Sequence, residues 1–162
     1  MKYLNNYIQE KLKITSNTKI QSKEYKYHPE DGRELEKIIE KLIAENGSDA
    51  DLNDIDISKI QYLDYLFCEI NYSYKIGNID ISEWDVSNVL NMEGMFLNCE
   101  SFNCDLSNWN VSKVNNMYCM FQNCKNFTGY GLDKWKLKKD CDINEIFKGC
   151  DNLSNIKLNK CL

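Results

Sequence analysis

The sequence predicts an α/β solenoid in which short parallel strands alternate with short helices, closed at its N-terminal end by a helical cap. Three observations predict this fold class. Trp84, Trp109 and Trp135 stand 25 and 26 residues apart. The residues around them repeat one order of apolar and polar side chains, and an amphipathic segment precedes the first copy. Such a period is typical of chains in which each repeat packs only against its neighbours.

Each repeat begins with a short strand. Trp84 and Val86 have the period of two that places both apolar side chains on one face of a strand. The apolar residues that follow, Val89, Met92, Met95 and Cys99, have helical spacing. The same columns recur in residues 105–128 and 131–154, and the pattern extends to 52–67 and to Leu158. This gives five expected rungs, at Ile55, Trp84, Trp109, Trp135 and Ile156.

One column of the repeat predicts where the helices end. Asn98, Asn123 and Gly149 share this column. Asn and Gly replace each other where the backbone has a positive φ angle, so we expect left-handed residues there. Ser58, Ser87 and Ser112 follow the strands and are expected as helix N-caps.

The segment before the repeats predicts a cap. Leu35, Ile38/Ile39 and Leu42/Ile43 form one apolar stripe, and Gly47 follows it, so we expect a helix over 32–46. We divide the chain into an N-terminal helix with a polar linker (1–24), the cap (25–51) and the repeat region (52–162).

The repeat text W-D-V-S-N-V-x-N-M-x-x-M-F-x-N-C-x-x-F-N resembles the BspA-like leucine-rich repeats. Phe147, Cys150, Leu153, Ile156 and Leu158 match that family's second pattern, F-x-x-C-x-x-L-x-x-I-x-L. The resemblance covers roughly residues 52–158. It implies a right-handed leucine-rich-repeat solenoid with about five short parallel strands and helices on the other side. It also implies a non-enzymatic binding scaffold, often an adhesin on bacterial surfaces.

Composition and the first residues indicate where the protein works. The 162 residues are 43% hydrophobic and 28% charged, as in a globular domain. Residues 1–6 lack the apolar stretch of a secretory signal, so we expect a cytoplasmic protein whose eight cysteines are thiols. No apolar run reaches the length of a membrane span. The alternatives are a surface-exposed adhesin exported by a non-classical route and a phage virion protein that contacts the host.

The side chains that flank each rung predict the binding surface, because they point away from the core. Residues 51–108 carry a net charge of −9 and residues 109–162 a net charge of +4. The flanking positions follow the same trend, from acidic through amide to basic, so we expect a protein partner with the opposite gradient. The competing interpretation is a surface that is merely polar. The predicted partner-binding residues are Asp54, Asp56, Glu83, Asp85, Asn108, Asn110, Lys134, Lys136 and Lys157.

We predict no catalytic residue, cofactor or metal site. Cys99, Cys124 and Cys150 repeat in register and are expected in the core as small apolar side chains. His28 is the only histidine, and an enzyme that uses it with a cysteine is the rival hypothesis. Acidic residues surround the lysines of 134–139, so no nucleic-acid partner is expected.

Overall fold

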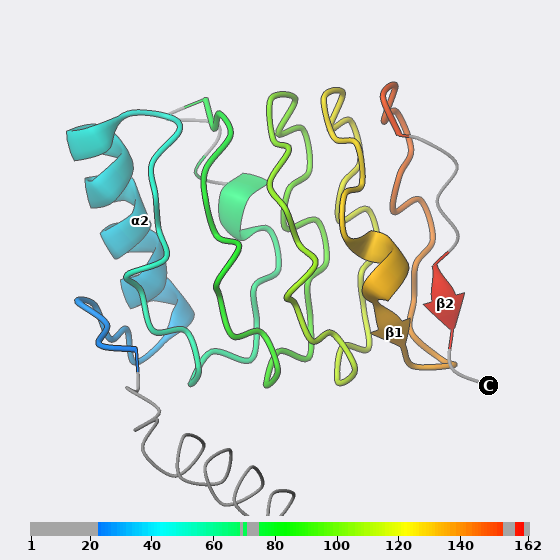
Figure 1. Cartoon of the computed structure of the whole chain (residues 1–162), viewed down its shortest axis with the longest axis horizontal. Helices are drawn as coiled ribbons and strands as arrows, with labels where there is room; N and C mark the ends of the chain where they lie inside the picture. The colour runs from blue at the N-terminus through cyan, green and yellow to red at the C-terminus, as the bar shows by residue number, and fades with distance from the viewer. Residues whose placement is uncertain (1–22, 69, 71–74, 154–157, 161–162) are drawn as a thin grey trace, which may run out of the picture.

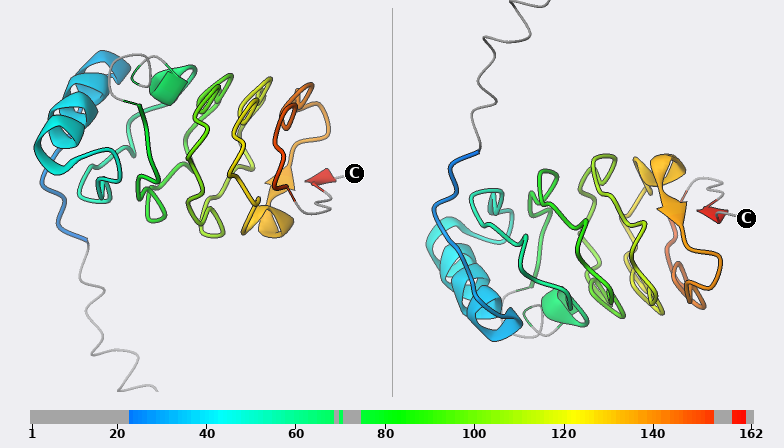
Figure 2. Two further views of the ribbon diagram at one scale, coloured as in Figure 1. Left: turned by 90° about the horizontal axis from the view of Figure 1, so that it is seen from above. Right: turned by 90° about the horizontal axis from the view of Figure 1, so that it is seen from below.

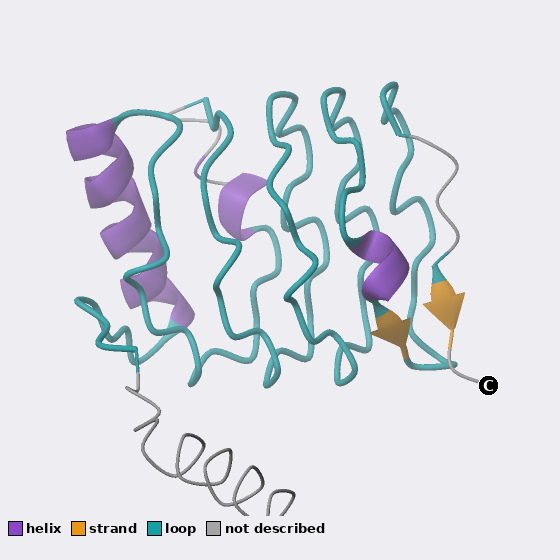
Figure 3. Cartoon of the chain, in the orientation of Figure 1, coloured by secondary structure: helices purple, strands orange, loops and turns teal. Residues whose placement is uncertain are grey.

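The computed structural model describes residues 23–68, 70, 75–153 and 158–160. Its elements are helix α2 (Gly32–Asn46), the 3-10 helix η1 (Leu132–Lys134) and the strands β1 (Lys136–Leu137) and β2 (Asn159–Lys160), as Figure 1 shows. Residues 66–68 and 70 are also helical. Most of the remaining described chain consists of loops and turns (Figure 3). The helix expected near the N-terminus lies outside the described residues.

The predicted leucine-rich-repeat solenoid is wrong. In the described ranges the only sheet has two strands of two residues each, which pair in parallel. The helices expected after the rungs at Trp84, Trp109 and Trp135 are absent, since residues 91–99, 116–124 and 142–150 form turns or irregular backbone. Five parallel strands backed by a row of helices are therefore not present in the part of the chain that the structure describes.

Left-handed residues explain why these segments are not helices. Asn98, Asn123 and Gly149 have φ angles of 63°, 61° and 75°, which confirms the left-handed column predicted from the sequence. Four residues earlier, Gly94 and Cys119 have φ angles of 55° and 53°. An α-helix requires consecutive right-handed residues, so two left-handed residues in each segment reduce it to single turns.

Backbone hydrogen bonds join each of these segments to the next. We call residues 62–68, 91–98, 116–123 and 142–149 the turn ladder. Isolated parallel bridges connect its first positions, Tyr62 to Asn91, Asn91 to Asn116 and Asn116 to Asp142. Hydrogen bonds of 2.7–3.1 Å continue from these bridges along alternate residues. The repeats consequently lie side by side, in both views of Figure 2.

Buried aromatic columns run through the repeats. The rings of Phe67, Phe96, Phe121 and Phe147 stack at centroid distances of 5.2, 5.4 and 5.9 Å. Each indole N–H donates to a carbonyl of the preceding repeat, Trp84 to Leu52, Trp109 to Ile81 and Trp135 to Leu106, at 3.0–3.1 Å. Burying these rings while satisfying their N–H groups fixes the register of the repeats.

The last predicted rung is shifted. Strand β2 pairs with β1 so that Asn159 lies opposite Lys136. This register brings Leu158, rather than Ile156, opposite Trp135. Ile156 itself lies outside the described residues.

Helix α2 covers the first repeat and spans the range predicted from the sequence. The carboxylate of Asp31 caps it by accepting from the Glu34 N–H at 2.8 Å, and Glu34 accepts in return from the Glu30 N–H at 2.8 Å. Gly47, at φ 92°, ends the helix and donates to the Ile43 carbonyl. Its buried face consists of Leu35, Ile39, Leu42 and Ile43.

Candidate interaction surface

Asp and Asn side chains build the corners of each repeat. These side chains occupy three columns of the repeat. In each column a carboxylate or amide oxygen accepts the backbone N–H two residues further on, at distances of 2.8–3.2 Å, which forms an Asx turn. These residues are Asp51, Asp80 and Asp105; Asp56, Asp85 and Asn110; and Asn91, Asn116 and Asp142. Ser58, Ser87 and Ser112 donate to the second set, so the prediction that they cap helices is wrong.

The predicted binding residues lie where the alternation of the sequence places them. The rung residues between them are buried. Asp56 is half-buried, and Lys157 lies outside the described residues. The other seven are exposed, namely Asp54, Glu83, Asp85, Asn108, Asn110, Lys134 and Lys136. We call these seven and Asp56 the rung-flanking surface.

The chain's own N-terminal segment pairs with the acidic part of this surface. Lys23 forms an ion pair with Glu83. His28 Nδ1 lies 3.4 Å from a carboxylate oxygen of Asp56. Residues 23–28 therefore lie beside the first two rungs, and the Lys23 ammonium offsets the charge of Glu83, which the sequence pattern does not reveal.

Hydrogen bonds stabilise the charged form of Asp56. Burial alone raises the pKa of this carboxyl, but hydrogen bonds from the Ser58 side chain and backbone and from His28 outweigh it, and the pKa is lowered. Asp56 thus forms an Asx turn with Ser58 and contacts His28 of the N-terminal segment. Binding a partner is not required to explain this residue.

The basic part of the surface is not paired in this way. Lys134 and Lys136 are exposed, and among the described residues neither ammonium group makes an ion pair or a hydrogen bond. The neighbouring Lys138 donates to the Asn115 side chain at 2.6 Å. The positive charge that this surface offers a partner is therefore concentrated at Lys134 and Lys136.

Cys99 and Cys124 lie in the core, as predicted, whereas Cys150 is only partly buried against it. Cys124 and Cys150 donate to the carbonyls of Phe96 and Phe121 at 3.0 and 2.9 Å. Burial raises the pKa of the Cys99 and Cys124 thiols. The second nitrogen of His28 lies 3.2 Å from the Tyr25 carbonyl oxygen. In the part of the chain that is described, no group of three or more histidine, cysteine or acidic residues could hold a metal ion.

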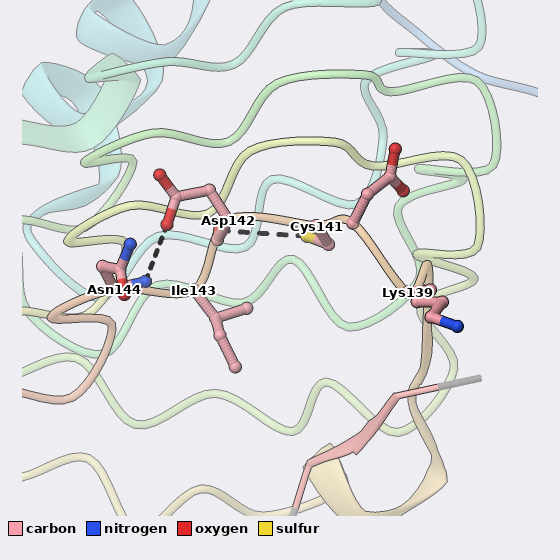
Figure 4. A pocket seen from close by; sticks show the side chains of 6 residues that line it. Lys139, Cys141, Asp142, Ile143 and Asn144 are labelled. Atoms are coloured by element: carbon pink, nitrogen blue, oxygen red, sulfur yellow. Dashed lines mark hydrogen bonds between the residues drawn. The ribbon is translucent and has the colours of Figure 1, made fainter. Parts of the chain in front are cut away.

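A shallow hollow lies at the C-terminal end of the repeats, along residues 139–144 (Figure 4). The Asn144 N–H donates to Asp142 at 2.9 Å, and the Cys141 thiol lies 3.9 Å from the Asp142 carbonyl oxygen. The side chain of Ile143 points away from those of Asp142 and Asn144 (Figure 4). The residues that line the hollow therefore belong to the last corner and to the last apolar column.

Comparisons with known proteins correct the predicted family. No curated protein and no solved structure matched the chain. Within the described ranges, every helix is too short or too polar to cross a lipid bilayer. Residues 35–160 match a family model described as "Mycoplasma protein of unknown function, DUF285", not the BspA-like leucine-rich repeats. Apolar columns about 25 residues apart indicate that repeats stack, but they do not distinguish the backbone between the columns. The chain belongs to the DUF285 family.

Proposed function

We propose that this chain is a non-enzymatic protein-binding module that engages its partner through the rung-flanking surface. One observation carries the proposal. The side chains on either side of each buried rung residue change from one repeat to the next. They are carboxylates at Ile55 and Trp84, amides at Trp109 and lysines at Trp135.

The buried columns give this surface a rigid support. Trp84, Trp109 and Trp135 are 1–4% exposed, and their indoles are hydrogen bonded to neighbouring repeats. Side chains next to them are held at fixed spacing, which reduces the entropy lost when a partner binds.

The pairing within the chain defines the partner further. Lys23 offsets part of the charge of the acidic half, whereas Lys134 and Lys136 form no ion pair within the part of the chain that the structure describes. Complementary charge mainly sets orientation and association rate. The partner we propose therefore places acidic side chains opposite Lys134 and Lys136, and polar groups opposite Asn108 and Asn110.

The proposal is tested by capture from native cells with a matched pair of charge reversals. The test bait carries Lys134→Glu and Lys136→Glu. The control bait carries Lys37→Glu and Lys41→Glu on the exposed side of α2, so that both have the same net charge. We expect a protein that wild type and control retain equally and that the test bait loses by about tenfold. Equal capture by all three baits, with unchanged thermal unfolding, contradicts the proposal.

A further inference from the structure

The backbone hydrogen bonds along the turn ladder have a direction. The N–H groups of Met92, Gly94 and Phe96 donate to the following repeat at 2.8–2.9 Å. The carbonyls of Asn91 and Glu93, in contrast, accept from the preceding repeat at 2.8–2.9 Å. The donors at these alternate residues therefore face the C-terminal end of the molecule, whereas Asn91 and Asp142, at the first ladder position, donate to the preceding repeat.

This polarity leaves a row of donors at the C-terminal end. Met117, Cys119, Phe121 and Asn123 donate to the last repeat at 2.7–3.1 Å. The equivalent N–H groups of that last repeat belong to Ile143, Glu145, Phe147 and Gly149. Among the described residues these four groups donate no hydrogen bond. We call them the donor edge.

Incompletely covered apolar side chains border the donor edge. Met117, Phe121, Cys124 and Phe127 are 0% exposed. Their counterparts in the last repeat, Ile143, Phe147, Cys150 and Leu153, are only partly buried. Open backbone donors beside partly exposed apolar columns form a template for another chain segment.

A second copy of this chain does not fit the edge. The donor edge of that copy offers no acceptors. Its row of ladder carbonyls belongs to the first repeat, against which α2 packs (Figure 2). A Cβ on Gly32 would lie 3.9 Å from the Tyr62 carbonyl oxygen, so the helix stands at the start of that row.

We propose that the donor edge docks a turn-ladder segment of a partner protein whose own first repeat lacks a helical cap. Such a segment supplies carbonyls at alternate residues and continues the apolar columns, as each interior repeat does for the one before it. This site is separate from the rung-flanking surface, and either proposal can fail without the other.

The test uses the full chain, labelled with ¹⁵N, and a peptide with the sequence of residues 115–128. The peptide is also joined to Leu162 through a flexible Gly/Ser linker, which raises its effective concentration to about millimolar. We expect slower amide exchange at Ile143, Glu145, Phe147 and Gly149 with the peptide, and no change with a scrambled peptide. No protection in the tethered protein, or equal protection by the scrambled peptide, overturns the proposal.

A matched pair of variants distinguishes docking at the donor edge from non-specific binding of the peptide. Ile143→Asp places a carboxylate on the edge, and Ser101→Asp places one on an exposed site of an interior repeat. Burying a charge against the apolar columns is costly, so Ile143→Asp should weaken peptide binding about tenfold or more. Ser101→Asp, and the Lys134→Glu and Lys136→Glu bait, should bind as wild type does. If Ile143→Asp binds the peptide as tightly as wild type does, and amide exchange in the interior repeats is unchanged, the proposal is contradicted.

Discussion

Phe121 and Phe147 occupy the same position of neighbouring repeats, but among the described residues only Phe121 has a turn-ladder segment on both sides. Its ring stacks on Phe96 at 5.4 Å, on Phe147 at 5.9 Å and on Phe127 at 4.2 Å, and it is fully buried. Phe147 stacks on Phe121 and is only partly buried. The interior repeats and the last repeat thus share a sequence pattern but differ in what each side chain contacts.

The two ends of the molecule extend this comparison. At the N-terminal end α2 contributes Leu35 and Ile39, both 0% exposed, to cover the first repeat. At the other end the described residues leave Ile143 and Phe147 partly exposed. In a chain of repeats stability comes from the contacts between neighbours, so we expect it to decrease toward the C-terminal end.

The largest expected effect compares the two phenylalanines directly. Phe121→Ala removes a fully buried ring and should lower the free energy of unfolding by about 3–5 kcal/mol. Phe147→Ala removes a ring that is only partly buried and should cost about half as much, because less apolar area returns to water. Urea unfolding followed by circular dichroism measures both losses. Equal losses would mean that the last repeat is covered as well as the interior.

The sequence predicted the columns but not the backbone that carries them. Val89, Met92 and Met95 recur every three residues, which suits both a helix and a series of single turns. The Asn98 column showed one left-handed position because Asn and Gly share it. The other left-handed column holds Tyr65, Gly94, Cys119 and Glu145, and this mixture gives no sign of a positive φ angle.

The candidate surface was predictable only in part. Exposure of the side chains beside each rung follows from the strict alternation around Trp84 and Trp109. The ion pair of Lys23 with Glu83 joins residues 60 positions apart, and no local pattern contains that information. The Asx turn at Asp85 could have been predicted, because Asp or Asn recurs two residues before Ser in the repeats. Asp56, Asp85 and Asn110 therefore belong both to the charge gradient and to the Asx turns.

A smaller effect tests whether the difference between the regions comes from stacking. Asp85 in an interior repeat accepts the Ser87 N–H at 3.0 Å, and Asp142 in the last repeat accepts the Asn144 N–H at 2.9 Å. Both bonds are local, so Asp85→Ala and Asp142→Ala should each cost about 1 kcal/mol. Asp85→Asn keeps the acceptor and should recover most of the loss. Unequal costs in urea unfolding would show that the corners, too, depend on the neighbouring repeat.

The smallest effect concerns acid stability in the interior, where Asp80 interacts with both neighbouring repeats. Burial alone raises the pKa of Asp80, but hydrogen bonds from Ser82, Asn53 and Cys104 outweigh it and lower the pKa below the ordinary value of 3.8. A folded-state pKa below the unfolded value gives stability that is present above pH 3.8 and is lost as the pH falls through the lower, folded value. Asp80→Asn keeps an acceptor without the titration, so its unfolding free energy should fall less than that of wild type between about pH 5 and pH 3.

Ser82→Ala distinguishes this linkage from a general acid effect. The Ser82 hydroxyl donates to Asp80 at 2.7 Å, whereas the Ser82 N–H donates to the same oxygen at 3.0 Å and remains in the variant. Removing one of the two donors should raise the pKa of Asp80 toward its ordinary value and give a pH dependence between those of wild type and Asp80→Asn. Carbon-detected NMR titration of the carboxyl follows this pKa directly. If all three proteins lost stability in parallel, the hydrogen bonds at Asp80 would not determine the charge state of this corner.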